Sequence, residues 1–287
     1  MPIYTKEELE AVHNKLLAMA QVFVDFCKEH DLLCYFCGGG CIGSVRNQGF
    51  IPWDDDLDFF MPREDYERLK TLWVNEGRYI LRFPSRDYYN GNNMITLRDA
   101  ETTQIKTYQA EMDIEHGLAI DIFPLDGCPT GWLKRRMQYI YAMVQTLFAT
   151  NQIPEKHGAL ATLGGKVLLG LFPKAKTRWH IWHWAEKRMS RFPIAKHEKI
   201  TELCTGPVSM KYEYPAEYFA SAVWLPFEDT EMPVPVGYDG YLRIAFGDYM
   251  TPPPPEKQVA HHACIKLDAE RSYREYKGVY YCTKEDA

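Results

Sequence analysis

The sequence lacks any long hydrophobic run. No stretch reaches the roughly 18–20 apolar residues that a transmembrane helix needs. The longest candidate, residues 159–172, is shorter than this and contains Lys166. The first ten residues, MPIYTKEELE, are polar and acidic, and no apolar segment of the kind found in secretory signal peptides follows them. We therefore expect a cytoplasmic protein.

The chain also has no excess of positive charge. Its formal net charge is −6 at pH 7, which argues against nucleic-acid binding driven by bulk charge. Cys34 and Cys37 form a C-x-x-C, but no second pair of cysteines follows at a comparable spacing, as a structural zinc site would require. The pattern therefore favours small buried thiols over a metal or redox site.

Apolar periodicity predicts a chain in which strands and helices alternate first and helices dominate later. Thr5 and Glu8 form a capping box at the start of a helix expected over 5–30. Strands are expected at 32–39, 56–61, 78–83, 93–98, 103–108 and 117–126, and further helices at 62–75, 131–149, 158–171, 175–191 and 237–247. This order predicts the α+β class.

Acidic residues crowd the start of one predicted strand. IPWDDDLDFF places Asp54, Asp55, Asp56 and Asp58 directly before two phenylalanines. Alternate residues of a strand face the same side, so Asp56 and Asp58 should project together. Two carboxylates that enter an apolar core repel each other and resist desolvation, and a divalent cation resolves that conflict. Asp54 and Asp55 fit a supporting or structural role equally well.

A third carboxylate and a glycine-rich segment complete the pattern. Asp121 stands between two isoleucines in the predicted strand 117–126, where a lone aspartate needs a partner. CGGGCIGSVR, residues 37–46, follows a strand, and its glycines should form a turn that exposes N–H groups to an anion, with Arg46 as a phosphate-binding fork. This layout is typical of phosphoryl transfer, although no Walker A motif is present.

At these residues the sequence is recognisable. GGGCIGSVRNQGFIPWDDDLDFFMPREDYERL, residues 38–69, resembles the signature of the LicD family, the bacterial phosphocholine transferases related to fukutin and fukutin-related protein. IDIFPLDG (120–127) and the segment 233–254 resemble two further blocks of that family, so the likeness spans about residues 30–265. The resemblance implies a nucleotidyltransferase-like mixed sheet flanked by helices.

The resemblance also implies an activity. It is the transfer of phosphocholine, or a similar phospho-alcohol, from a CDP-linked donor such as CDP-choline to a hydroxyl of a glycan or lipid-linked oligosaccharide, as in teichoic acid or lipopolysaccharide. Mg²⁺ or Mn²⁺ would be held by three catalytic carboxylates, Asp56, Asp58 and Asp121. Phosphate oxygens would be held by Gly38, Gly39, Gly40 and Arg46. Gly40 and Gly38 depart from the family, where Thr and Ser are common, so backbone N–H groups would replace those hydroxyls.

Several residues keep two interpretations. Trp53, Tyr66, Trp224 and Tyr238 could form an aromatic pocket for choline or could be packing residues. Arg63 could contact phosphate or stand exposed in the first turn of a helix. The basic, tryptophan-rich stretch 174–191 could touch the inner face of a membrane or pack as an ordinary helix. The roles of His261 and His262 stay open.

The domain organisation and the reaction also have alternatives. We expect a catalytic core over 1–130, a helical region over 131–200 and a C-terminal region over 201–287 that packs back on the core as one compact unit. A true nucleotidyltransferase, which attaches a nucleoside monophosphate to a small-molecule or sugar hydroxyl, is the second candidate. A catalytically inactive binding homologue is the third.

Overall fold

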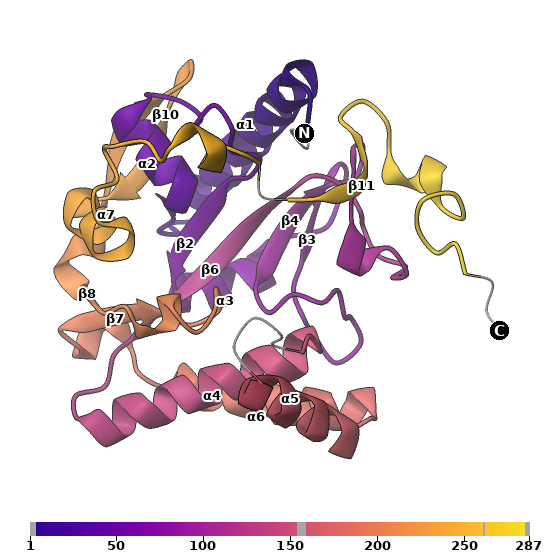
Figure 1. The fold of residues 1–287 in the computed structure, drawn as a ribbon. Helices are drawn as coiled ribbons and strands as arrows, with labels where there is room; N and C mark the ends of the chain where they lie inside the picture. Colours follow the sequence, from indigo (N-terminus) through magenta and orange to yellow (C-terminus); the bar gives the residue numbers. More distant parts are fainter. Residues whose placement is uncertain (1–3, 154–158, 261, 285–287) are drawn as a thin grey trace. The chain divides into compact units, whose positions relative to one another are not determined.

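The structure is a computed structural model that describes residues 4–153, 159–260 and 262–284. Its helices in this part of the chain are α1 (Lys6–Glu29), α2 (Gly38–Arg46), α3 (Arg63–Leu72), α4 (Trp132–Thr150), α5 (Ala159–Leu171), α6 (Ala175–Met189) and α7 (Tyr238–Phe246). Its strands are β1 (Tyr35–Cys37), β2 (Asp58–Pro62), β3 (Tyr79–Arg82), β4 (Ile95–Asp99), β5 (Thr103–Lys106), β6 (Ala119–Gly127), β7 (Lys199–Glu202), β8 (Tyr214–Pro215), β9 (Ala222–Phe227), β10 (Thr230–Pro235) and β11 (Cys264–Asp268). The α+β class is confirmed (Figure 1).

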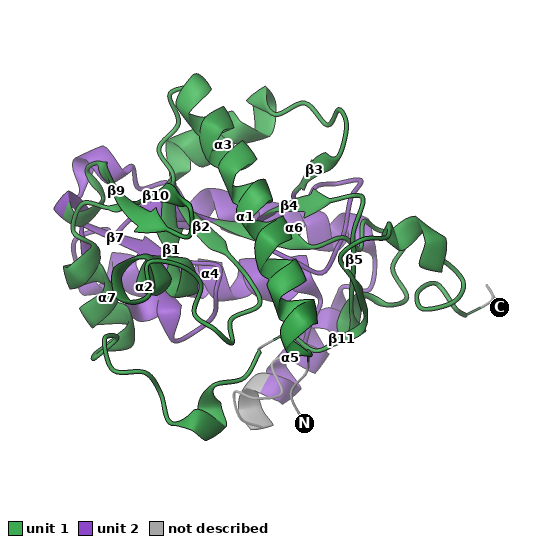
Figure 2. Ribbon diagram, turned by 90° about the horizontal axis from the view of Figure 1, so that it is seen from above, with its two compact units in different colours: residues 1–82, 96–122, 218–287 green, residues 83–95, 123–217 purple. Residues whose placement is uncertain are grey.

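The chain forms two compact units (Figure 2). Unit 1 comprises residues 1–82, 96–122 and 218–287, and unit 2 comprises residues 83–95 and 123–217. Three separated stretches of sequence therefore build unit 1. The boundaries expected from the sequence at residues 130 and 200 stay predictions.

A mixed sheet organises unit 1. Its strand order is β1-β2-β6-β4-β3, and it includes a parallel pair. β1 pairs with β2 in antiparallel register, which sets Cys37 opposite Asp58. β2 and β6 are neighbours, so Asp58 and Asp121 come from adjacent strands. The last residues of β6, Leu125 to Gly127, belong to unit 2 and pair there with β7.

Helix α1 begins at the predicted capping box. The Thr5 hydroxyl accepts the Glu8 N–H at 3.1 Å, and the Glu8 carboxylate accepts the Thr5 N–H at 2.9 Å. One face of α1 is buried, and its Phe23 packs edge-on against Phe59 of β2, with ring centroids 4.9 Å apart. Phe36 of β1 contacts the same Phe59 ring at 4.7 Å. These aromatic contacts fix the two strands that carry the acidic and glycine-rich segments.

Two local predictions about these segments were wrong. The glycines form no turn: Gly38 to Gly40 are the first residues of helix α2, which begins at once after β1 because Gly38 adopts a left-handed φ of +51°. Strand β2 begins at Asp58, so Asp56 lies ahead of the strand and does not share a strand face with Asp58. The irregular segment 54–57, which follows a turn at residues 52–53, thus brings these carboxylates together in place of strand alternation.

Unit 2 is built mainly from helices. Phe148 and Ala149 of α4, Leu169 of α5 and Trp182 of α6 form one buried cluster. β7 pairs with β6 on one side and with the short strand β8 on the other. Within the described ranges, no helix combines the length and the apolar character needed to cross a membrane.

Candidate functional site

Asp58 is the first residue of β2 and lies beside the start of helix α2. Its register partner is Cys37, the residue directly before the glycines. Burial raises the pKa of Asp58 well above its ordinary value, and the negative charges of Asp56 and Asp121 raise it further. These three predicted carboxylates therefore lie within electrostatic reach of one another. An ionised Asp58 needs a compensating positive charge.

Asp121 has a carboxylate oxygen that no hydrogen bond satisfies. It lies on β6, the neighbour of β2 in the sheet. Its Oδ1 atom is buried and has no hydrogen-bond partner. A buried carboxylate oxygen without a partner is costly, and a hard cation is one partner that would remove that cost.

Asp54 occupies the space above the glycines. A Cβ added to Gly39 would overlap Oδ2 of Asp54 and lie 3.1 Å from its Cγ. The carboxylate thus faces the N-terminal turn of α2, where the free N–H groups favour negative charge. Burial, followed by the charges of Asp56 and Asp55, raises the pKa of Asp54 to about 7. A larger residue at position 39 would therefore have to displace the Asp54 carboxyl group.

Asp55 is buried and bonded to the C-terminal segment. It is only 2% exposed and accepts the backbone N–H of His262 at 3.1 Å. Its Oδ1 lies 3.2 Å from Nδ1 of His262, which also lies 3.5 Å from Oδ2 of Asp56. The hydrogen bond to Asp55 raises the pKa of His262 above its ordinary value. Asp55 therefore ties the C-terminal segment to the acidic segment, whereas His261 lies outside the described residues.

Lys106 joins the site although the sequence analysis did not single it out. It ends strand β5, which is buried at every position, and Lys106 itself is 8% exposed. Burial raises the pKa of Asp56 and Asp58, and the positive charge of Lys106 opposes that rise, so Lys106 lies within electrostatic reach of these carboxylates. β11 pairs with β5 and sets Cys264 opposite Lys106, close in sequence to His262. The feature that could have identified Lys106 is its position at the end of an otherwise buried strand.

The residues expected to hold phosphate already have protein contacts. The N–H of Gly38 donates to the hydroxyl of Tyr241 at 3.0 Å. Arg46 donates through Nη1 to the carbonyl of Tyr249 at 2.9 Å. Burial lowers the pKa of Arg46, while the charge of Asp54 opposes that shift, so the guanidinium lies near the acidic cluster. A Cβ at Gly40 would lie 3.1 Å from the Phe36 ring.

The other predicted binding residues have contacts of their own. Arg63 forms an ion pair with Glu67 at 3.3 Å and lies 5.2 Å from the ring centre of Tyr66. The ammonium of Lys28 covers the ring of Trp224 at 4.2 Å. The half-buried residues Trp53, before β2, and Tyr238, at the start of α7, complete the set. Their role in binding stays a prediction.

The metal site also stays a prediction. Among the residues that the structure describes, no three His, Cys, Asp or Glu side chains converge as a ready set of metal ligands. The donor set nevertheless suits Mg²⁺ or Mn²⁺, which prefer carboxylate oxygens. The raised pKa of Asp58 and the unpartnered Oδ1 of Asp121 both indicate that this cluster accommodates additional positive charge.

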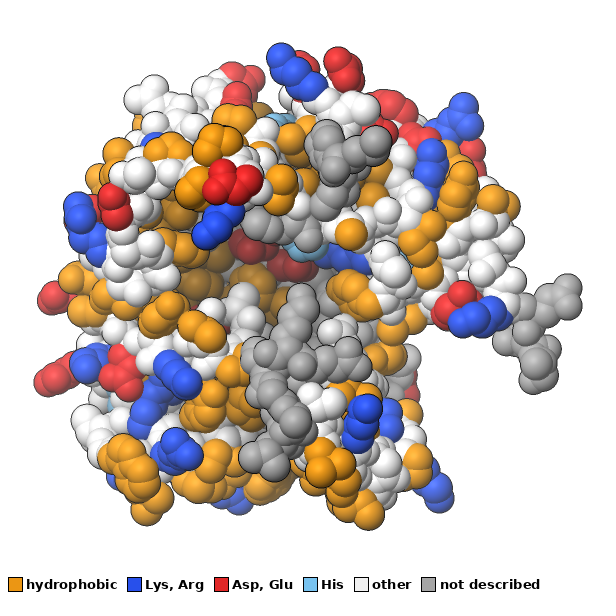
Figure 3. Space-filling model, viewed as in Figure 1, with side chains coloured by type: hydrophobic (Ala, Val, Ile, Leu, Met, Phe, Trp, Pro, Cys, Tyr) orange, Lys and Arg blue, Asp and Glu red, His pale blue; other side chains and the backbone are white. Residues whose placement is uncertain are grey.

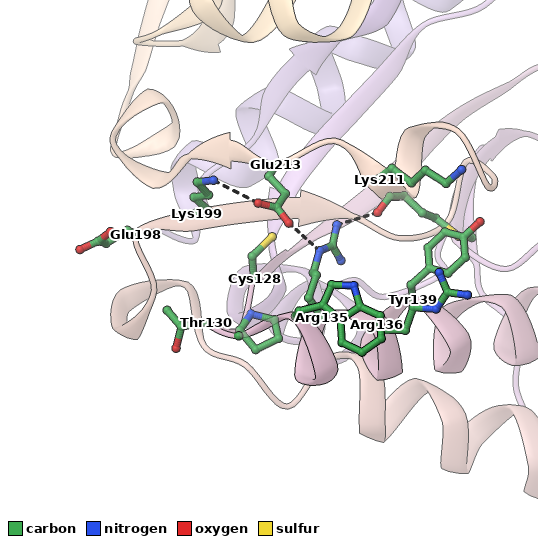
Figure 4. A pocket seen from close by; sticks show the side chains of 13 residues that line it. Cys128, Thr130, Arg135, Arg136, Tyr139, Glu198, Lys199, Lys211 and Glu213 are labelled. Carbon is green, nitrogen blue, oxygen red and sulfur yellow. Dashed lines mark hydrogen bonds and ion pairs between the residues drawn. The ribbon is translucent and has the colours of Figure 1, made fainter.

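Unit 2 contains a separate cavity of about 550 Å³ near the start of α4 (Figure 4). None of the predicted site residues lines it. Arg135 donates to Glu213 at 3.0 Å and to the carbonyl of Met210 at 2.7 Å, and Lys199 pairs with Glu213 at 3.2 Å. Two basic side chains thus share one carboxylate, and basic residues outnumber acidic ones in the lining, so this cavity is distinct from the acidic cluster.

Comparisons with known proteins agree with the geometry. Residues 32–154 match the family model described as LicD/FKTN/FKRP, nucleotidyltransferase domain. Lipopolysaccharide cholinephosphotransferase LicD of Haemophilus influenzae is 25% identical over 261 residues, which cover 86% of this chain and 92% of that protein. Mannosyltransferase regulator 4 of Saccharomyces cerevisiae is 29% identical over 176 residues, which cover 59% of this chain and 14% of that protein.

The matched range includes Gly38 to Gly40 and all three of Asp56, Asp58 and Asp121. The resemblance that these residues carry is thereby confirmed. Residues 32–154 of the chain are thus similar to the LicD/FKTN/FKRP nucleotidyltransferase domain, and most of the chain is similar to a LicD cholinephosphotransferase.

Proposed function

We propose that the protein transfers phosphocholine, or a similar phospho-alcohol, from a CDP-linked donor to a hydroxyl of a cell-surface glycan precursor. The observation that carries the proposal is the cluster of Asp56, Asp58 and Asp121, in which one buried carboxylate oxygen has no partner. The relative from Haemophilus influenzae supports the donor group, because its name is that of a cholinephosphotransferase and the match covers 92% of its length.

The proposed reaction makes one bond to phosphorus and breaks another. The acceptor oxygen attacks the phosphorus that carries choline, and the bond from that phosphorus to the CMP oxygen breaks, so CMP leaves. The acceptor hydroxyl loses its proton, and we assign the Asp121 carboxylate, through the oxygen that does not bind metal, to orient that hydroxyl and receive the proton. No oxidant or further substrate is needed for this balance.

The chain's own charges suit a diphosphate donor. Asp56, Asp58 and Asp121 would hold Mg²⁺ or Mn²⁺, which supplies positive charge beside the diphosphate when bound. Lys106 lies within electrostatic reach of the same carboxylates and would contact a phosphate oxygen. The N-terminal turn of α2 adds backbone N–H groups, and binding there would move the Asp54 carboxylate off Gly39.

The test is a donor-turnover assay on the purified chain. CDP-choline, Mg²⁺ and a lipooligosaccharide without phosphocholine are the substrates, and CMP release and product mass are measured. Asp58→Asn should lower turnover by at least about 10²-fold, as expected for loss of a charged group at the reacting centre. Asp25→Asn, at a residue whose side chain is 74% exposed on α1, should not change it. Undiminished turnover by the Asp58 variant would contradict the proposal.

A second function is favoured by the description of the matching family model, which is a nucleotidyltransferase domain. In that reaction the acceptor would gain a nucleoside monophosphate and pyrophosphate would leave, so the product mass separates the two. If the chain is instead a catalytically inactive binding homologue, the expected result is different. CDP-choline would then raise the melting temperature by binding the native state, but neither metal would produce turnover.

A further inference from the structure

Helix α5 of unit 2 presents a row of apolar side chains to solvent. Leu163, Val167 and Leu171 are 61%, 51% and 66% exposed, respectively. They are spaced four residues apart, so they lie on one face of the helix. Phe172, directly after the helix, is 36% exposed. We call the three helical residues the α5 stripe.

The structure holds this helix in one orientation. Leu169, on the other side of α5, is 8% exposed and packs in the cluster that contains Phe148 and Trp182. Arg178 closes the C-terminal end, because its guanidinium donates to the carbonyls of Leu169 at 3.0 Å and Phe172 at 2.7 Å. The helix therefore cannot roll to bury the stripe without breaking these contacts.

The sequence around the stripe has charge of one sign. No aspartate or glutamate stands between Glu155 and Glu186 in the sequence. Lys166, Lys174 and Lys176 fall in this interval, and all three are exposed. In Figure 3, orange side chains lie among blue ones along the lower edge of the view, where Figure 1 draws α4, α5 and α6. An apolar helix face bordered by lysines is complementary to a surface with an apolar interior and negatively charged groups at its boundary.

We propose that α5 docks unit 2 on the surface of an anionic lipid bilayer. α5 has 13 residues, which is too short to span a bilayer, so the helix would lie in the interfacial plane with the stripe among the acyl chains. The lysines would contact lipid phosphates. This inference does not depend on the proposed reaction, since it uses no residue of the acidic site.

Helix α6 supplies less apolar surface than its tryptophans suggested. Trp182 and Met189 are buried within unit 2, whereas Trp184 is 48% exposed. Membrane contact through residues 174–191 stays a prediction. In the present proposal this segment contributes the basic residues Lys174 and Lys176, and α5 contributes the apolar face.

Vesicle flotation of the full chain tests the proposal without any donor or acceptor. The vesicles contain phosphatidylcholine alone or phosphatidylcholine with phosphatidylglycerol at 7:3. The chain should float with the anionic vesicles, and the bound fraction should fall as salt is raised. Val167→Glu/Leu171→Glu should weaken binding by at least about tenfold, because it removes buried apolar area and adds negative charge. Lys174→Glu/Lys176→Glu should weaken it at least about fivefold per residue.

Val74→Glu is the matched control, because Val74 is 65% exposed and belongs to unit 1. It should float as the natural chain does. Melting temperatures of all variants should agree with that of the natural chain, since every substituted side chain is exposed. Failure of the natural chain to float with anionic vesicles would overturn the proposal. So would a stable dimer in solution that the Val167/Leu171 variant abolishes, because the stripe would then bind a second copy.

Discussion

Replacing Gly39 with alanine should displace the Asp54 carboxylate from helix α2. The new Cβ would overlap Asp54 Oδ2 and lie 3.1 Å from Cγ, so the carboxyl must move. Overpacking of this kind costs about 1–3 kcal/mol, and alanine returns about 1 kcal/mol of helix propensity. We therefore expect Gly39→Ala to lower the free energy of unfolding by about 0–2 kcal/mol, measured by urea denaturation.

A double-mutant cycle isolates the contact. In an Asp54→Ala background no carboxylate meets the new Cβ, so Gly39→Ala should there be neutral or stabilise by up to about 1 kcal/mol. The coupling between the two positions should be about 1–3 kcal/mol. Gly164→Ala is the control, because no atom lies within 4 Å of an added Cβ at Gly164; it should stabilise by about 0.5–1 kcal/mol in either background.

The same substitution should affect catalysis if the acidic cluster is the active site. A shift of about 1 Å at a positioned group can cost on the order of 10²-fold in rate, so kcat/KM for CDP-choline should fall by about that factor. Zero coupling between positions 39 and 54 would refute the contact. Coupling with unchanged kcat/KM would keep the contact and refute its placement in the active site.

Three other perturbations have defined outcomes. Arg78→Met should cost about 3 kcal/mol in urea denaturation, because it leaves the wholly buried Asp99 without its ion-pair partner at 2.6 Å. Burial raises the pKa of Glu202 from 4.5 to about 6, so ionisation disfavours the folded state and stability is greater at low pH. The difference in unfolding free energy between the natural chain and the Glu202→Gln variant should therefore fall by about 2 kcal/mol from pH 4 to pH 7. A difference that does not change with pH would contradict this prediction. Lys106→Met should raise the KM for the donor about tenfold, because a charged phosphate contact is lost. The metal concentration that gives half-maximal activity should fall, because a positive charge near the carboxylates is removed. A rise in that concentration would show that Lys106 does not act at these carboxylates.

The sequence predicted most of the helices and strands whose formation depends on neighbouring residues. The capping box of Thr5 and Glu8 formed as expected, because both partners lie within one helical turn. The strand that carries Asp121 was visible from its continuous apolar run. The hairpin of β9 and β10 was not predicted, since Pro226, Pro233 and Pro235 argue against strand structure.

The contacts that shape the site depend on distant parts of the chain, and no local pattern encodes them. The approach of Asp54 to Gly39 depends on the turn at residues 52–53 and the irregular segment that follows it, which strand periodicity does not predict. Lys106 reaches the carboxylates through the placement of β5, some 50 residues further along the chain. His262 meets Asp55 across a separation of 207 residues. The acidic residues could be chosen from the sequence, but their partners could not.

The hydrogen bonds from Gly38 to Tyr241 and from Arg46 to Tyr249 have a consequence for synthesis on the ribosome. Each joins residues 203 positions apart, and the tie between Asp55 and His262 spans slightly more. Closing such long loops is slow and costs entropy. During translation the glycine and acidic segments therefore emerge long before their partners exist. The nascent chain must carry an unfinished acidic cluster until the last part of unit 1 has left the exit tunnel, and premature termination near residue 240 would leave that cluster open.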